Sequence, residues 1–162
     1  MNKEPVTYRY FWQGIDAQVT KIRSSIKRLN FNPDMIVGIS RGGLIPATLL
    51  SYMMGLPVCS LQWQRRDLAK QRDHTQLREI LLASKTGIVI VDDILDSGET
   101  LREIDEYIRY FLGSNELDER DKKVPVRYAV CVKRAEVTSP VPDLIYGVQL
   151  ENIDWVVFPW GE

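Results

Sequence analysis

The chain has 162 residues and a formal net charge of -1 at pH 7, with a sequence pI near 5.9. This length suits one domain with a sizeable hydrophobic core. The near-neutral charge gives no electrostatic case for binding nucleic acid, and no apolar run reaches the roughly eighteen residues of a transmembrane helix. Because residues 1–5 contain no hydrophobic signal-peptide region, we expect a cytoplasmic protein without a membrane segment.

Apolar residues recur at spacings of three and four between residues 11 and 29, which predicts a long amphipathic helix. They are Phe11, Ile15, Val19, Ile22, Ile26 and Leu29. Asn30 and Pro33 are expected to end this helix. The apolar surplus nearby permits a homodimer or higher oligomer, but it does not fix the oligomeric state.

The segment Met35–Ile39 predicts a buried strand, and a helix is expected from Leu44 to Met54. Between them stands the turn Ser40-Arg41-Gly42-Gly43. Two glycines let backbone amides approach a ligand closely, the helix start favours an anion, and arginine adds a fixed positive charge. The turn is therefore a candidate anion site, although strand-glycine-glycine-helix on its own is often only a tight turn.

A third strand is predicted at Val58–Trp63, followed by a polar, basic segment at residues 64–74 without periodicity. His74, the only histidine, is interpreted as a surface residue. Cys59 and Cys131 both fall in apparent strands and are expected to be reduced thiols, as is usual in a cytoplasmic protein.

The most informative stretch covers residues 89–101. It begins with β-branched residues, which predict a strand buried on both faces, and continues through acids, a hydroxyl and a glycine into an amphipathic helix ending near Phe111. The turn between them lies at the carboxyl end of a strand, where open α/β sheets bind their ligands.

Three carboxylates, Asp92, Asp93 and Asp96, lie within this turn. Like charges beside an apolar strand raise one another's pKa, so a divalent cation or a pair of ligand hydroxyls is needed to offset them. The residues from Asp96 to Thr100 suit an anion, because a glycine permits a positive φ and two hydroxyls lie beside the amides of a helix start. Acids beside an anion-binding turn fit a phosphorylated ribose; the alternative is an ordinary solvent-facing acidic turn.

The C-terminal third contains a charged connection at residues 113–123, a predicted strand at Val126–Val132 and another at Leu144–Leu150. Lys133 and Arg134 follow the first of these strands and are expected at the same edge of the sheet as the two anion-binding turns. The tryptophans at 155 and 160 could fill the core or offer a flat surface to an aromatic base.

The run at 90–100, Ile-Val-Asp-Asp-Ile-Leu-Asp-Ser-Gly-Glu-Thr, resembles without a gap the phosphoribosyl-diphosphate signature of type I phosphoribosyltransferases. In that family, a hydrophobic strand and two acids precede an Asp-Ser/Thr-Gly-x-Thr phosphate loop. The resemblance spans about residues 35–162 and is most specific at this run. It also places residues 64–74 at the family's mobile catalytic loop, although the Ser-Tyr pair that often begins the loop is replaced by Gln62-Trp63.

The resemblance implies roles for both turns. The ribose and its 5-phosphate are expected to contact Asp92, Asp93, Asp96, Ser97, Gly98, Glu99 and Thr100. The diphosphate is expected at Ser40, Arg41, Gly42 and Gly43, with a cis peptide bond between Ser40 and Arg41. Asp96 is the candidate catalytic base, which would accept the imidazole proton of a purine.

The base-binding residues follow from a less specific part of the resemblance. In six-oxopurine transferases a Val-Lys strand end precedes, by some twenty residues, an aromatic residue that stacks on the purine. By this pattern Lys133 donates to the six-oxygen, Trp155 covers the ring, and the Val156 backbone contacts the two-position. Mg²⁺ is the expected cofactor, held by Asp92, Asp93 and Glu162, with Asp154 a weaker candidate than Glu162.

Together these features predict an α/β fold, a mostly parallel sheet flanked by helices, in a single phosphoribosyltransferase domain covering residues 1–162. Its core is expected at about 35–135, with a small C-terminal base-binding hood from about 136–162 and the N-terminal helix alongside. The predicted activity is transfer of the 5-phosphoribosyl group from phosphoribosyl diphosphate to hypoxanthine, guanine or xanthine in purine salvage.

Three alternatives remain open from the sequence. The first is a pyrimidine phosphoribosyltransferase. The second is a regulator that senses phosphoribosyl diphosphate on the same fold without turnover, and the third is an unrelated nucleotide-binding α/β domain. Base preference among the purines also stays open, because a lysine opposite a six-oxo group accepts all three.

Overall fold

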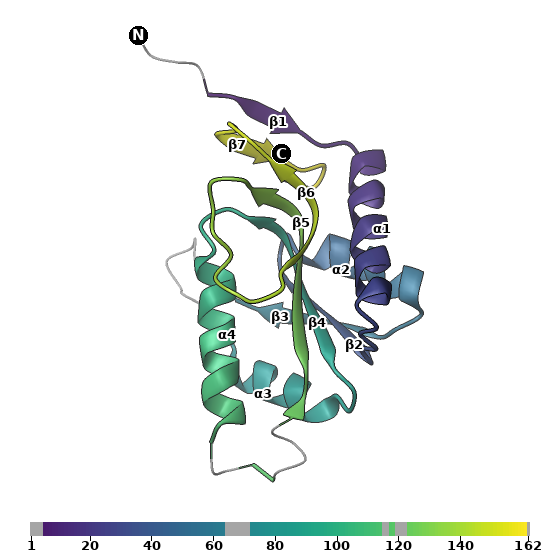
Figure 1. Cartoon of the computed structure of the whole chain (residues 1–162), viewed down its shortest axis with the longest axis vertical. Coiled ribbons are helices and arrows are strands. Elements are labelled where there is room, and N and C mark those ends of the chain that lie inside the picture. The colour runs from purple at the N-terminus through teal and green to yellow at the C-terminus, as the bar shows by residue number, and fades with distance from the viewer. Residues whose placement is uncertain (1–4, 64–71, 115–116, 119–122, 162) are drawn as a thin grey trace.

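The computed structural model describes residues 5–63, 72–114, 117–118 and 123–161, which form a five-stranded parallel sheet with helices on both faces (Figure 1). Along the chain the strands of this sheet are β2 (Met35–Ser40), β3 (Val58–Gln62), β4 (Ile88–Leu95), β5 (Val126–Arg134) and β6 (Ile145–Leu150). Their spatial order is β3-β2-β4-β5-β6, and each neighbouring pair is parallel. The predicted α/β class is confirmed.

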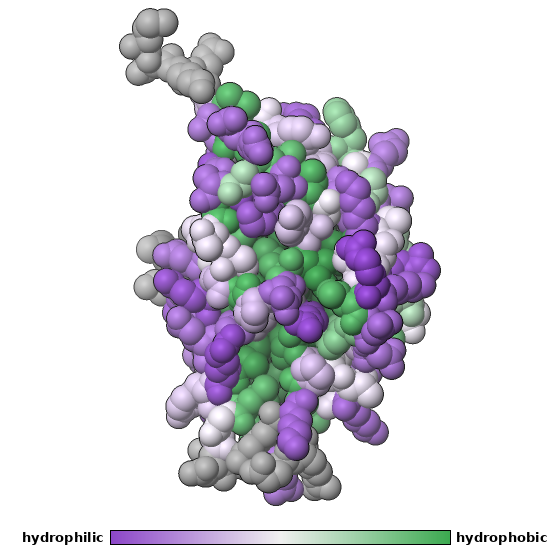
Figure 2. Space-filling view, viewed as in Figure 1, coloured by the Kyte–Doolittle hydropathy of each residue, from purple (hydrophilic) through white to green (hydrophobic). Residues whose placement is uncertain are grey.

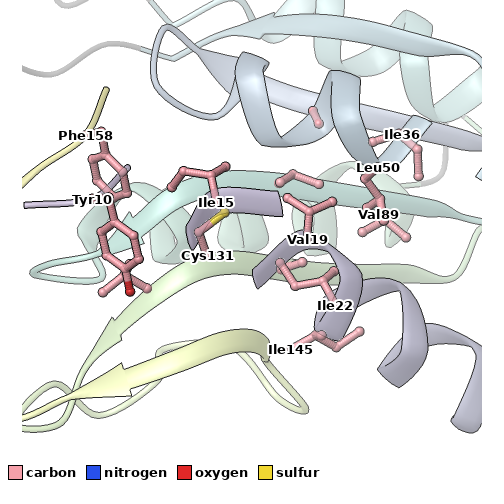
Figure 3. Close-up of a cluster of buried hydrophobic side chains, with 14 of the residues drawn as sticks. Tyr10, Ile15, Val19, Ile22, Ile36, Leu50, Val89, Cys131, Ile145 and Phe158 are labelled. Carbon is pink, nitrogen blue, oxygen red and sulfur yellow. The ribbon is translucent and has the colours of Figure 1, made fainter. Parts of the chain in front are cut away.

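Two helices pack on each face of the sheet. On one face lie α1 (Trp12–Arg28) and α2 (Leu44–Met54), and on the other α3 (His74–Ala83) and α4 (Glu99–Leu112). Successive side chains of a strand point to opposite faces, so Val89 and Val91 of β4 pack under α1 and α2, whereas Ile88 and Ile90 pack under α3 and α4. Figure 3 shows the first of these two hydrophobic clusters, with α1 side chains packed against the sheet.

A second, two-stranded sheet lies at one end of the molecule, above the large one in Figure 1. It pairs β1 (Thr7–Arg9) in parallel with β7 (Trp155–Val157). The two ends of the described chain therefore meet, and the C-terminal segment predicted as a hood takes its strand partner from the N-terminus. β1 could not be predicted from the sequence, because its three residues are all exposed and show no alternation.

The edge of the hydrophobic core reaches the surface on the face seen in Figure 1. Figure 2 shows hydrophobic residues along the middle of this face, flanked by hydrophilic ones. In Figure 1 the same region lies over β5 and β6, between α1 and α4, and β6 is the edge strand of the sheet. No helix in the described part of the chain is long and apolar enough to cross a membrane.

Several local predictions can be compared directly with the structure. The peptide bond between Ser40 and Arg41 is cis, as expected. Both cysteines are free, as expected, and burial raises the pKa of the Cys131 thiol to about 12. β5 continues two residues beyond its predicted end and so includes Lys133 and Arg134.

Helix α3 was not predicted, and it supplies a large part of the second core face. It begins after Asp73, whose carboxylate accepts a hydrogen bond of 2.8 Å from the Gln76 amide, as an N-cap residue does. Leu77, Ile80 and Leu81 then pack inward at helical spacing. The polar segment that precedes it, residues 64–71, lies outside the described residues, so the prediction of a catalytic loop there stays a prediction.

Adjacent leucines of α3 provide a matched test of this packing. Leu81 is 1% exposed and Leu82 is 50% exposed. Leu81→Ala is expected to lower the free energy of unfolding by about 2–5 kcal/mol, because it leaves a cavity in the core, whereas Leu82→Ala should lower it by less than ~1 kcal/mol. Both changes alter helix propensity equally, so urea unfolding of the two variants isolates burial, and equal losses would contradict the assigned faces.

Candidate active site

The order of the strands creates a crevice at one edge of the large sheet. From β2 the chain crosses to β3 on one side, and from β4 it crosses to β5 on the other. Neighbouring strands that connect in opposite directions leave a crevice at their carboxyl ends, where α/β proteins bind ligands. A cavity of about 1000 Å³ opens there, lined by the turn after β2, by the end of β4 with its following turn, and by residues of the C-terminal segment.

Asp92 and Asp93 lie next to each other at the carboxyl end of β4, and both line this cavity. They are half-buried, and the Asp93 amide donates to Oδ1 of Asp92 at 3.0 Å. Burial, followed by the neighbouring carboxylate of Asp93, raises the pKa of Asp92 well above its ordinary value. Burial also raises the pKa of Asp93, opposed by a hydrogen bond from the Trp160 side chain. The pair is thus disfavoured in its doubly charged form unless a cation or hydroxyl donors bind.

The glycine turn after β2 packs directly onto this acidic pair. A Cβ placed on Gly42 would overlap Oδ2 of Asp93, and one placed on Gly43 would lie 2.9 Å from the Asp92 Cα. No other residue type fits at these positions without moving the acids. The proximity of the two turns, inferred from their separate strand ends, is therefore present in the structure, and glycine is what allows it.

The remaining residues of this first turn differ in their placement. Ser40 and Arg41 line the cavity together with Gly42, and the Ser40 hydroxyl donates to the Leu61 carbonyl oxygen at 2.9 Å. Arg41 is exposed at the rim, where its charge is available to an anionic ligand. Gly43 is buried between β2 and β4 and does not line the cavity.

The turn after β4 brings four of its predicted residues to the cavity, namely Asp96, Ser97, Gly98 and Thr100. Gly98 adopts a left-handed conformation with φ of 80°, which suits glycine, and α4 begins at the next residue. The Glu99 amide donates to the Ser97 hydroxyl at 3.4 Å, but Glu99 itself does not line the cavity. A helix start with hydroxyls beside it is a favourable place for a phosphate.

Asp96 lines the cavity and forms an ion pair with Arg134. Nη1 of Arg134 donates to Oδ1 of Asp96 at 2.8 Å, while its Nε donates to Oε1 of Glu136 at 2.6 Å. The guanidinium is thus fixed between two carboxylates, and it holds one oxygen of Asp96 in place. Sequence reasoning placed Arg134 at this edge but gave it no role.

Lys133, in contrast, does not line the cavity. Its amine donates to the Gln149 side chain at 3.1 Å and lies 6.0 Å from the centre of the Tyr146 ring, both on β6. Successive side chains of a strand point to opposite faces of the sheet. Arg134 therefore points to the cavity, whereas Lys133 points to the other face and contacts side chains of β6 there. Extending the predicted strand by two residues would have revealed this difference.

The predicted base-binding residues of β7 do lie at the cavity. Trp155 is 51% exposed, Val156 is buried, and both contribute to the lining. Asp154, which also lines the cavity, accepts a hydrogen bond of 2.8 Å on Oδ2 from the Val6 amide and so fastens β7 to the N-terminal segment. Glu162, the stronger candidate for a metal ligand, lies outside the described residues.

The acidic pair fits Mg²⁺ in number and in chemistry. Among the described residues there is no group of three or more His, Cys, Asp or Glu side chains that could hold a metal ion by themselves. Mg²⁺ does not need such a group, since it commonly takes one or two carboxylates and completes its shell with phosphate oxygens and water. Two adjacent half-buried carboxylates facing a cavity that a helix start with hydroxyls also lines meet that requirement.

Comparison with known proteins agrees with this geometry. Residues 11–162 match the family model of the phosphoribosyl transferase domain. The chain belongs to the phosphoribosyltransferase family. The protein is therefore a pentosyltransferase, and the family resemblance of residues 90–100 is confirmed.

Curated relatives and solved structures cover most of the chain. A xanthine-guanine phosphoribosyltransferase of Gluconobacter oxydans is 24% identical over 166 residues, covering 98% of this chain and 89% of that protein. One from Idiomarina loihiensis is 26% identical over 128 residues, covering 77% and 69%. The crystal structure of a purine phosphoribosyltransferase from Pyrococcus horikoshii has a TM-score of 0.64 and 26% identity, and covers 96% of this chain and 94% of that one.

The contact between Gly42 and Asp93 yields a first prediction for this site. Gly42→Ala is expected to displace the Asp93 carboxylate and weaken binding of phosphoribosyl diphosphate at least ~10-fold, measured by calorimetry. Gly55→Ala is the control, because it adds the same methyl group at a helix end where nothing lies within 4 Å. At φ of 67° the control should lose about 1–2 kcal/mol of stability but keep its affinity. Equal affinities in both variants would contradict the proposed contact.

The raised pKa values of the acidic pair yield a second prediction. In the unfolded chain Asp92 loses its proton near its ordinary pKa of 3.8, but in the folded protein it does so only at higher pH. The unfolded state therefore binds fewer protons in this interval, and the ligand-free protein loses stability as pH rises through it. Asp92→Asn should remove this loss of stability. At pH 7 its Tm should rise by roughly 3 °C for each ~1 kcal/mol gained in the free energy of unfolding, and at pH 3.5 it should change little.

Thermal melts at both pH values without Mg²⁺ would measure this effect. Asp143→Asn is the control, since Asp143 is an exposed aspartate whose side chain is paired with Arg127 outside the cavity lining. If Asp92→Asn were less stable than the wild type at pH 7, the acids would not be in conflict, and the need for a neutralising ligand would disappear.

Proposed function

We propose that this enzyme transfers the 5-phosphoribosyl group from phosphoribosyl diphosphate to hypoxanthine, guanine or xanthine, with release of diphosphate, in cytoplasmic purine salvage. One observation carries the proposal: the acidic pair, the glycine turn and the Trp155 side chain all line the same cavity. A sugar phosphate and a flat base would both be within reach of that lining. The names of the purine-specific relatives support the choice of base.

The sugar-phosphate half of the cavity suits phosphoribosyl diphosphate. Residues Ser97–Thr100 would hold the 5-phosphate at the start of α4, where helix amides favour an anion. Asp92 and Asp93 would accept hydrogen bonds from the ribose hydroxyls or bind them through Mg²⁺. The turn Ser40–Gly43 would hold the diphosphate, with Arg41 supplying positive charge at the rim.

The reaction would break the bond between ribose C1 and a diphosphate oxygen and form a bond between C1 and a nitrogen of the base. Mg²⁺, when bound, would offset negative charge on the departing diphosphate. The carboxylates of the acidic pair would favour the positive charge that develops on the ribose. Asp96 would accept the proton that the base loses, and Arg134 would keep the Asp96 carboxylate oriented for this transfer.

The base half of the cavity would use β7. Trp155 would stack on the base, and the buried Val156 would contribute its backbone at the two-position. For Lys133 to donate to the six-oxygen, as the family pattern implies, its amine must leave Gln149 on binding. Arg134 is the cation of this strand end that already lines the cavity.

Diphosphate release tests the proposed function. The enzyme would be incubated with phosphoribosyl diphosphate, Mg²⁺ and each base of a panel in turn: hypoxanthine, guanine, xanthine, adenine, uracil and orotate. Release with one or more of the first three is expected. Release only with a pyrimidine would overturn the choice of base, and binding of phosphoribosyl diphosphate without release in any incubation would favour a regulator.

The role of Asp96 gives a separate prediction. Asp96→Asn is expected to lower kcat by roughly 100-fold or more, because general-base catalysis contributes about that factor, while the Kd for phosphoribosyl diphosphate changes by less than ~3-fold. Asp143→Asn again serves as the control, since it removes a charge from another Asp–Arg ion pair outside the cavity lining. Parallel losses of kcat and of substrate affinity in Asp96→Asn would show that Asp96 is structural.

A further inference from the structure

Trp160 connects the two halves of the cavity, and the proposed mechanism gives it no role, whereas its sequence position left open whether it fills the core or faces an aromatic base. It lies on the C-terminal segment that follows β7, and it lines the cavity. Its side chain is placed to hydrogen-bond Asp93 of the acidic pair, and this interaction lowers the pKa of that carboxyl against the effect of burial. The indole N–H is the only donor that a tryptophan side chain has, so the direction of this bond is fixed: Trp160 donates and the carboxylate accepts.

The Trp160 ring is itself held by an aromatic stack. It lies parallel to the Phe158 ring, with centroids 4.9 Å apart, and Phe158 lies parallel to Tyr10, with centroids 5.7 Å apart. Phe158 and Tyr10 are 6% and 5% exposed, so this stack is part of the core. Figure 3 shows the two rings together at one end of the hydrophobic cluster.

The backbone joins this stack to the base-binding strand. Tyr10 directly follows β1, and its amide donates to the Val157 carbonyl oxygen at 2.9 Å. Within the small sheet, Thr7 pairs with Trp155 and Tyr8 with Val156. Movement of β7 therefore has to move the stack, and movement of the stack has to move the donor to Asp93.

Asp93 is in turn held on two sides. Its carboxylate packs against Gly42 on one side and accepts the hydrogen bond from Trp160 on the other. A half-buried carboxylate beside a second one has a strong tendency to turn away, so a directed donor in a rigid ring is an effective means of orienting it.

We propose that Trp160 is a positioning residue that couples the base-binding strand to the ribose-binding acid Asp93. A base packed between Trp155 and Val156 fixes residues 155–160, and this fixes the orientation of the Asp93 carboxylate. A bound base then raises the affinity for phosphoribosyl diphosphate. By thermodynamic reciprocity, bound phosphoribosyl diphosphate raises the affinity for the base by the same factor. This inference rests on the proposed function.

Trp160→Phe tests it, because phenylalanine keeps a ring in the stack but has no N–H. Binding of phosphoribosyl diphosphate with Mg²⁺ would be measured by calorimetry, with and without a 9-deazapurine, in which carbon replaces the accepting nitrogen so that no transfer occurs. In the wild type the deazapurine is expected to tighten binding about 5-fold or more. In Trp160→Phe, affinity without the base analogue should fall about 10-fold, as for loss of a hydrogen bond to a charged group, and the tightening should fall to below about 2-fold.

Trp12→Phe is the matched control. The Trp12 ring contacts Trp160 at a centroid distance of 5.9 Å and is 55% exposed. Trp12 does not line the cavity, so this variant makes the same substitution outside the proposed site. Its affinity and its coupling factor should equal those of the wild type. Phe158→Leu is a second variant, which keeps the Trp160 donor and loosens the stack; it should lower the coupling factor and leave affinity without the base analogue within about 3-fold.

The outcomes separate the inference from the proposed function. A wild type that releases diphosphate with a purine, beside a Trp160→Phe variant with unchanged affinity and coupling, overturns the inference alone. A wild type that does not bind phosphoribosyl diphosphate overturns both. A purely structural role would lower the Tm of Trp160→Phe and leave the coupling factor at its wild-type value, so that result also counts against the inference.

Discussion

The close approach of two carboxylates at the end of a buried strand is the constraint on which the rest of the site depends. Burial raises the pKa values of Asp92 and Asp93, and the neighbouring Asp93 carboxylate raises that of Asp92 further, so the doubly ionised pair is unfavourable in the ligand-free protein. Two neighbours accommodate them: the glycine turn after β2 leaves them room, and the Trp160 side chain lowers the pKa of Asp93 against the effect of burial. Carboxylates with raised pKa values are expected at sites where a cationic or polyhydroxyl ligand stabilises their ionised form.

The topology explains why these parts meet. β2 and β4 are adjacent although β3 lies between them in sequence, and the chain leaves the pair in opposite directions. The turns after the two strands are therefore neighbours at one edge of the sheet, where open α/β sheets bind their ligands. The small β1–β7 sheet then places residues 7–9 beside the C-terminal segment, which forms the other wall of the cavity.

Much of this arrangement could be predicted from the sequence, because local patterns determine it. The parallel sheet, the two glycine-containing turns at its edge and the placement of Asp92, Asp93 and Asp96 follow from apolar runs that end in chemically distinctive residues. The parts that were missed depend on contacts between distant segments. β1 is three exposed residues whose strand pairing exists only through β7, and Trp160 acquires its partner from β4. The position of Arg134 at the cavity could have been predicted, since strand alternation places it and Lys133 on opposite faces of the sheet. The predicted strand, however, ended at Val132, two residues too early. Helix α3 was missed although its cap and its apolar spacing are local.

The central claim is that a sugar phosphate and its metal neutralise the acidic pair. A crystal structure of the enzyme with phosphoribosyl diphosphate and Mg²⁺ tests it most directly. The account predicts ribose hydroxyls or Mg²⁺ in contact with the Asp92 and Asp93 carboxylates, with the 5-phosphate on the amides of residues 97–100. Density for the ligand elsewhere, with both carboxylates still facing each other and touching no part of it, would contradict the account.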